Sequence, residues 1–168
     1  MKKRLYLMRG LPGSGKSFAI RRAIHDCGWN TSGVPELGLG RYPVASDAKI
    51  FSADDAFMVD GVYRFDSARI PFAHRECFRK FIGAVSCESV QPECIIVDNT
   101  GICAWELSPY CLAGEALGYD VTIVEMRFRN VRVCAERNLH GVPLRTIERM
   151  AESLRMEFLP HWWKRIRV

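Results

Sequence analysis

Residues 10–17 read Gly-Leu-Pro-Gly-Ser-Gly-Lys-Ser, and the class of fold can be inferred from this stretch. Its fixed positions match the spacing G-x-x-x-x-G-K-[ST], which is typical of a loop that wraps around phosphate groups. The short apolar run 4–8 precedes the loop, and an amphipathic stretch from 16 to about 27 follows it. A buried strand, a glycine-rich loop and a helix in this order predict a nucleotide-binding α/β fold.

The loop residues indicate how ATP and Mg²⁺ would be held. Glycines allow the backbone to turn its N–H groups toward phosphate, and the start of the helix adds its positive dipole end. The Lys16 ammonium group would neutralise the β- and γ-phosphates, and the Ser17 hydroxyl would ligate Mg²⁺. A glycine turn without a ligand is the alternative. The expected nucleotide-binding residues of the loop are Gly10, Pro12, Gly13, Ser14, Gly15, Lys16 and Ser17.

Strands and helices alternate along the rest of the chain. Further strands are expected at 49–52, 94–97 and 121–126, and helices at about 67–86, 105–117, 130–139 and 144–157. This order predicts a three-layer α/β fold, with a parallel sheet of four to five strands, helices on both faces and a small lid at about 137–145. We expect a single domain over 1–168, with a long surface excursion at about 28–46.

Three aspartates follow predicted strands, where parallel sheets bind their ligands. Asp98 follows the apolar run 94–97, the usual place for an acidic residue that holds Mg²⁺ beside a phosphate-binding loop, although it could instead cap the next turn. Asp54 and Asp55 follow the strand 49–52. One of them could accept the proton of an attacking hydroxyl, whereas an N-capping role is the alternative for Asp54.

The predicted lid carries candidate arginines for contact with the transferred phosphate. Arg137 precedes the helix break at 140–143, and an arginine brought over the phosphates would stabilise charge in the transition state. Arg145 and Arg149 lie on the next helix and could do the same. Spacing alone does not choose among the three.

Composition bounds the function only loosely. The chain has 168 residues, and 24 Lys and Arg against 19 Asp and Glu give a net charge of +5, which suits an anionic substrate. No apolar run is long enough to span a membrane, so we expect a cytoplasmic protein without membrane partners. The basic and aromatic residues at 161–167 could stack on bases, but we expect the tryptophans to pack on the domain.

Seven stretches together resemble the P-loop kinase domain of the 5′-hydroxyl polynucleotide kinases and related small ATP-binding proteins. They occur in order and cover most of residues 4–156. The matching stretches are Met8-Arg-Gly-Leu-Pro-Gly-Ser-Gly-Lys-Ser17, Phe51-Ser-Ala-Asp-Asp55, Gly61-Val-Tyr-Arg-Phe-Asp66, Ala73-His74, Ile96-Val-Asp-Asn-Thr100, Trp105-Glu-Leu-Ser-Pro-Tyr110 and Glu136-Arg-Asn-Leu-His-Gly-Val-Pro143.

The resemblance implies a P-loop kinase fold with Lys16, Asp54 and Arg137 as catalytic residues. Asp54 would be the general base, and Arg137 would contact the transferred phosphate. The chain departs from the family at Phe57, where polynucleotide kinases carry an arginine that grips the acceptor phosphate. From the resemblance as a whole we expect transfer of the γ-phosphate of ATP to a hydroxyl, foremost the 5′-OH of RNA or DNA. A nucleoside or sugar-nucleotide kinase and a non-catalytic ATP-dependent module that binds nucleic acid or protein are the alternatives.

Overall fold

The computed structural model describes residues 2–29, 44–87, 89–127 and 130–168, so most of the predicted excursion at 28–46 lies outside the described residues. The strands are β1 (Arg4–Arg9), β2 (Lys49–Phe51), β3 (Met58–Val59), β4 (Val62–Tyr63), β5 (Cys94–Val97), β6 (Asp120–Glu125) and β7 (Arg165–Arg167). The helices are α1 (Lys16–His25), α2 (Ile70–Val85), α3 (Ala104–Ala116), α4 (Val131–Arg137) and α5 (Leu144–Met156), and short 3-10 helices cover Ala53–Phe57 and Ser67–Arg69.

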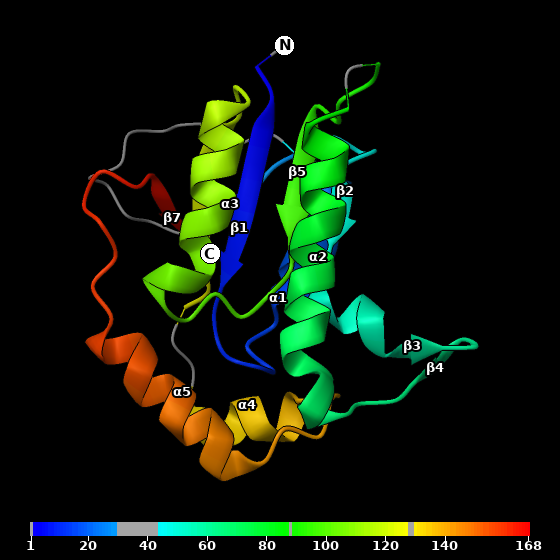
Figure 1. Ribbon diagram of the computed structural model, residues 1–168. Coiled ribbons are helices and arrows are strands. Elements are labelled where there is room, and N and C mark those ends of the chain that lie inside the picture. Colours follow the sequence, from blue (N-terminus) through cyan, green and yellow to red (C-terminus); the bar gives the residue numbers. More distant parts are fainter. Residues whose placement is uncertain (1, 30–43, 88, 128–129) are drawn as a thin grey trace.

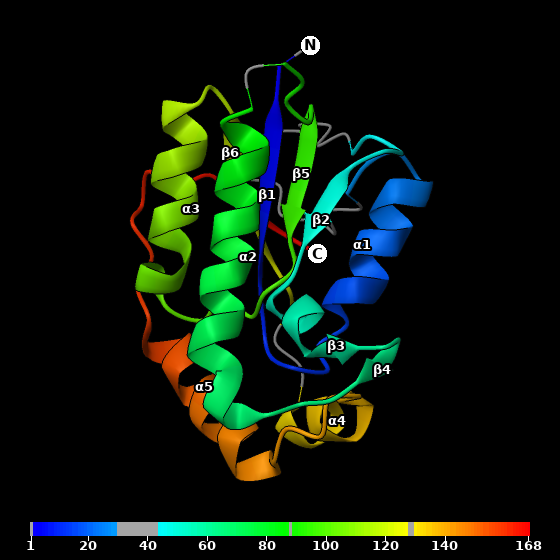
Figure 2. The ribbon, with the colours of Figure 1, turned by 45° about the vertical axis from the view of Figure 1, so that its right-hand side comes forward.

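A five-stranded parallel sheet of order β2-β5-β1-β6-β7 forms the middle layer. Successive residues of β1 enter different cores: Leu5 and Leu7 pack with residues of α2 and α3, whereas Tyr6 and Met8 pack with residues of α1. Figure 2 accordingly shows α2 and α3 on one side of the sheet and α1 on the other. A strand buried on both faces is expected to be continuously apolar, as β1 is, and the predicted three-layer fold is confirmed.

Helices α4 and α5 flank the predicted lid at about 137–145 and are called the lid helices here; they lie beyond the carboxyl ends of the strands. Figure 1 shows α4 and α5 past the arrowheads of β1 and β5, at the opposite end of the sheet from the N-terminus. The helix pair packs around its own small core, which includes Cys134 of α4 and Ile147 and Ala151 of α5. Leu11 of the glycine-rich loop belongs to the same core, so the lid is attached directly to that loop.

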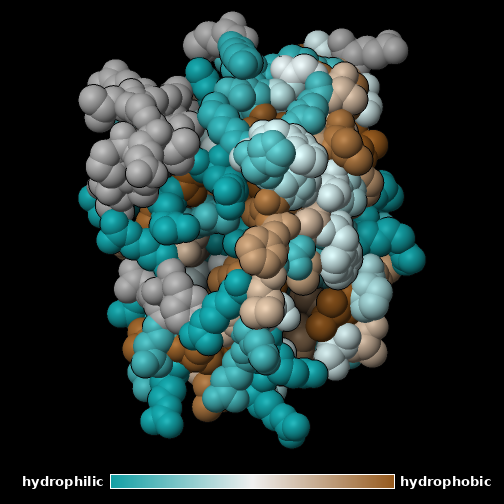
Figure 3. Space-filling model, turned by 90° about the vertical axis from the view of Figure 1, so that its left-hand side faces the viewer, coloured by the Kyte–Doolittle hydropathy of each residue, from teal (hydrophilic) through white to brown (hydrophobic). Residues whose placement is uncertain are grey.

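The segment after α5 is more regular than predicted. Residues 165–167 form β7 at the edge of the sheet, where Ile166 is buried beside Val124. The expected packing of both tryptophans is only half correct, since Trp163 packs against the core but Trp162 is 72% exposed. On the face shown in Figure 3, which carries this segment, hydrophobic surface is broken up by hydrophilic side chains.

A two-stranded hairpin, β3–β4, was not predicted. Asp60 and Gly61 both have positive φ, which is the backbone of the tight turn that suits the twist of paired strands. The rings of Tyr63 and of Phe65 just beyond it contact the ring of Phe57 at centroid distances of 6.0 and 5.2 Å. Because Phe57 is only 3% exposed, it anchors the hairpin to the core.

Within the described residues, no helix combines the length and the apolarity needed to cross a bilayer.

Candidate active site

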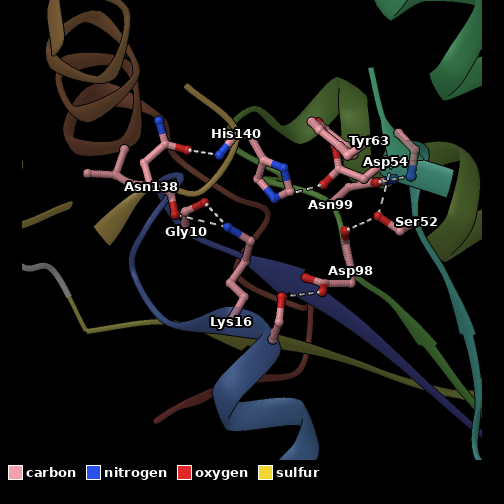
Figure 4. A network of polar contacts seen from close by, with 12 residues as sticks. Gly10, Lys16, Ser52, Asp54, Tyr63, Asp98, Asn99, Asn138 and His140 are labelled. Atoms are coloured by element: carbon pink, nitrogen blue, oxygen red, sulfur yellow. Dashed lines mark hydrogen bonds and ion pairs between the residues drawn. The ribbon is translucent and has the colours of Figure 1, made fainter. Parts of the chain in front are cut away.

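Three strand ends meet at one pocket of about 800 Å³. The glycine-rich loop follows β1, Asp54 follows β2, and Asp98 follows β5, so segments far apart in the sequence come together as the parallel sheet requires. Figure 4 shows this arrangement from close by. The predicted site residues that line the pocket are Pro12, Gly13, Ser14, Gly15, Lys16, Ser17, Asp54, Asp98 and Arg137. Gly10 is not part of this lining, but its carbonyl oxygen accepts a hydrogen bond from Lys16.

The Lys16 side chain folds back over the loop. Its Nζ donates hydrogen bonds to the carbonyl oxygens of Gly10 and Leu11, at 3.1 and 2.9 Å. Burial lowers the pKa of Lys16, and the charges of Asp98 and Asp54 oppose that shift. A cation with little access to water and no carboxylate hydrogen-bonded to it is well suited to bind an anion.

The loop also presents unused donors. The buried Ser14 hydroxyl has no hydrogen-bond partner among the described residues. Gly15 has φ +98° and precedes the first turn of α1, where backbone N–H groups lack helical partners. A phosphate group would accept from both kinds of donor, so the loop fits the nucleotide phosphates that the sequence predicts.

Ser17 and Asp98, the two predicted metal ligands, are hydrogen-bonded to each other. The Ser17 Oγ donates to Asp98 Oδ2 at 2.9 Å, which shows that the carboxylate faces the phosphate loop rather than its own turn. Burial raises the pKa of Asp98, although the Lys16 charge and the Ser17 hydrogen bond both oppose the shift. A cation placed here would offset the cost of burying the carboxylate.

The described parts of the chain contain no group of three or more His, Cys, Asp or Glu side chains able to hold a metal ion by themselves. One hydroxyl and one carboxylate nevertheless suit Mg²⁺, because this ion usually takes one or two protein ligands together with substrate phosphates and waters.

Asp54 is held from two sides. Its Oδ1 accepts a hydrogen bond from the Tyr63 hydroxyl at 3.0 Å, and its Oδ2 lies 3.6 Å from Nε2 of His140 in the lid. The 3-10 helix is capped by Ser52, whose Oγ accepts from the Asp54 N–H, so the Asp54 carboxylate is not an N-cap. The adjacent Asp55 is exposed and does not line the pocket.

The turn between α4 and α5 brings the lid to Asp54. The Asn138 Oδ1 accepts from the His140 N–H at 3.1 Å, and its Nδ2 donates to the Val142 carbonyl at 3.0 Å, so one side chain fixes the turn. The His140 ring also packs against Tyr63, with the centroids 4.7 Å apart. Arg137 lines the pocket, whereas Arg145 is exposed on α5 and lies outside its lining, as does Arg149.

The phosphate loop touches the lid helix at Gly13. A Cβ atom there would lie 1.9 Å from the Cys134 carbonyl oxygen, and Gly13 has φ +71°. The Gly13→Ala substitution is therefore expected to lower the free energy of unfolding by about 1–3 kcal/mol. Chemical denaturation of the purified variant and wild type measures this difference.

Gly83→Ala is the matched control, because a Cβ at this α2 position meets nothing within 4 Å and the backbone is helical. It is expected to raise the free energy of unfolding by about 0.5–1 kcal/mol, as alanine does in a helix interior. Equal stability of the Gly13→Ala variant and wild type would contradict the close packing of loop and lid.

Several pocket residues received no role in the sequence analysis. Tyr63 and His140 both approach Asp54. Asn99 accepts from the Ala53 N–H at 2.9 Å and so fixes the start of the 3-10 helix. The Asp-Gly turn at 60–61 was a usable signal for the hairpin that delivers Tyr63. His140 had no such signal, because its partner lies 86 positions earlier in the sequence.

The sequence is similar to a small part of a much longer protein. No protein-family model matches the chain. NEDD4-binding protein 2 of Homo sapiens is 36% identical in sequence over 88% of this chain, and the chain spans 7% of that protein's length.

Three solved structures share the architecture. A putative kinase from Chloroflexus aurantiacus matches all of this chain and 88% of its own, with a TM-score of 0.60 and 16% identity. A gluconokinase from Sinorhizobium meliloti matches 99% of this chain and 82% of its own (TM-score 0.54, 16% identity). The tunicamycin resistance protein of Deinococcus radiodurans matches 91% of this chain over 80% of its own chain (TM-score 0.50, 17% identity). The fold is therefore that of P-loop kinases.

Proposed function

We propose that residues 1–168 act as a single kinase-like domain that transfers the γ-phosphate of ATP to a hydroxyl group. The observation that carries this proposal is the meeting, in one pocket, of the glycine-rich loop, the hydrogen-bonded Ser17–Asp98 pair and a separate carboxylate. The loop and this pair alone would suit any ATPase or GTPase. The additional carboxylate, Asp54, has no place in phosphate binding and suits the activation of an acceptor.

Each side chain then has a part in the reaction. The loop donors and Lys16 would bind the β- and γ-phosphates, and Ser17 and Asp98 would hold Mg²⁺, which would supply neutralisation of phosphate charge. Asp54 accepts the acceptor hydroxyl proton as that oxygen forms a bond to the γ-phosphorus. The bond from the γ-phosphorus to the bridging oxygen breaks, and its electron pair stays on ADP. Arg137 would stabilise the negative charge that develops on the phosphoryl oxygens in the transition state.

We further propose that the acceptor is the 5′-OH of a polynucleotide. The sequence resemblance to 5′-hydroxyl polynucleotide kinases supports this choice, because it includes the paired acids, the hairpin segment and the Arg-Asn lid motif. A nucleoside or sugar nucleotide is the competing acceptor. The pocket residues that bind ATP would be the same for both, so the acceptor has to be identified by assay.

The test is transfer of label from γ-labelled ATP in the presence of Mg²⁺. We expect label in 5′-OH single-stranded RNA or DNA and none in the same oligonucleotides carrying a 5′-phosphate. Label in a nucleoside or sugar-nucleotide panel, but not in oligonucleotides, would reject the polynucleotide acceptor and retain the kinase. Binding of ATP with no labelled acceptor of any class would reject the kinase.

A further inference from the structure

Phe57 cannot help to hold an acceptor phosphate. Its ring is 3% exposed and packs against the hairpin rings of Tyr63 and Phe65. A polynucleotide with its 5′ end at Asp54 would still carry negative charge beyond the first nucleotide, and cationic side chains elsewhere would have to meet it.

Three side chains at the start of α2 form an exposed basic and aromatic group. The Phe72 ring is 40% exposed, and the guanidinium carbons of Arg69 and Arg75 each lie 5.6 Å from its centroid. Neither arginine forms an ion pair with any carboxylate of the described residues, whereas Arg79, one turn further along the same helix, is paired with Glu76 at 3.0 Å. The group, here called the Arg69–Phe72–Arg75 cluster, therefore exposes two guanidinium groups that have no direct ion pair with a described carboxylate.

The cluster adjoins the pocket. The Arg69 guanidinium donates to the carbonyl oxygen of Ala56 at 3.4 Å, so it lies against the 3-10 helix that carries Asp54. His74, on the same turns of α2, lines the pocket itself. Figure 2 shows the chain running from the β3–β4 hairpin to the start of α2. A strand leaving Asp54 in this direction would reach the cluster next.

We propose that the Arg69–Phe72–Arg75 cluster binds the single-stranded nucleic acid that follows the 5′-terminal nucleotide of the acceptor. Bases stack on aromatic rings and on arginine guanidinium planes, and arginine also pairs with the phosphates between them. An acidic peptide would pair with the two arginines, but it has no bases to stack on the Phe72 ring or on the guanidinium planes. The inference rests on the proposed polynucleotide acceptor and adds where its strand runs.

The experiment measures binding separately from phosphorylation. A fluorescently labelled 5′-OH oligonucleotide of about ten nucleotides is titrated with the 168-residue chain, and its anisotropy gives Kd. The variant Phe72→Ala combined with Arg75→Ala is expected to raise Kd by roughly 5- to 100-fold. It is also expected to reduce the slope of log Kd against log salt by about one. Arg69 is left in place because it contacts the 3-10 helix.

Arg79→Ala is the matched control, since Arg79 is an exposed arginine of the same helix. We expect it to leave Kd for the oligonucleotide unchanged, and both variants to bind ATP like wild type. An unchanged Kd in the double variant would overturn the cluster as a strand site. So would an oligoglutamate peptide that binds wild type as tightly as the oligonucleotide. Oligonucleotide binding that depends on the cluster, without label transfer to the oligonucleotide, would support the strand site and reject the polynucleotide as the phosphate acceptor.

Discussion

Replacing Asp54 by asparagine is expected to lower the turnover number by roughly 10²–10⁴-fold, the usual contribution of a general base. The amide keeps the size of the carboxylate, and its oxygen can still accept the hydrogen bond from Tyr63. It cannot take up the proton of the acceptor hydroxyl. Steady-state kinetics should show the loss in kcat, while calorimetry should show ATP binding close to that of wild type.

Asp55→Asn is the matched control for this experiment. The same change is made one position away, on an exposed side chain outside the pocket. It is expected to change kcat by no more than about twofold. Equal, small effects of both substitutions would refute Asp54 as the base. If the Asp54→Asn variant kept its biological function while a Lys16 variant lost it, the non-catalytic binding module would be the better description.

The Lys16→Met substitution is expected to remove most of the affinity for ATP. Deleting one partner of a buried, hydrogen-bonded charge pair costs about 2–5 kcal/mol, which corresponds to a rise in Kd of roughly 30- to 5,000-fold. Methionine keeps an apolar stem in the loop. Thermal unfolding measured with and without ATP and Mg²⁺ should show that the nucleotide no longer raises the unfolding temperature.

In the absence of ATP, loss of the Lys16 charge in the Lys16→Met variant is not expected to lower the free energy of unfolding relative to wild type. Burial holds the pKa of Lys16 below its ordinary value of 10.5, so the cationic form opposes folding. That cost is fully present below the lowered pKa and is lost as the pH rises toward the ordinary value. Lys80→Met, on the exposed surface of α2, is the control. Stabilisation by ATP that survived in the Lys16→Met variant would contradict the assigned role of Lys16.

The features that the sequence predicts well are those that follow from local pattern and sheet topology. The run before Gly10 is buried on both faces and therefore continuously apolar, which identifies β1. Once the strands are known to be parallel, their carboxyl ends must lie together, so Asp54 and Asp98 were expected to meet at the phosphate loop. The pocket contains both of them.

The features that were missed depend on contacts between distant or very short segments. The strand β7 has three residues and obtains its backbone partners from β6, some 40 positions earlier, a range over which periodicity carries no information. His140 reaches Asp54 only because Asn138 fixes the lid turn and Gly13 lets the loop approach α4. Such contacts arise from packing, which a single sequence does not display.

The contacts of Asp54 have a consequence for the entry of the acceptor. Tyr63 donates a hydrogen bond to one carboxylate oxygen, whereas His140 Nε2 lies 3.6 Å from the other, beyond hydrogen-bond distance. The Asp54 side chain is 47% exposed, so a hydroxyl can reach the oxygen beside His140 while Tyr63 keeps the carboxylate in place. The hairpin would thus orient the base and still leave it open to its substrate.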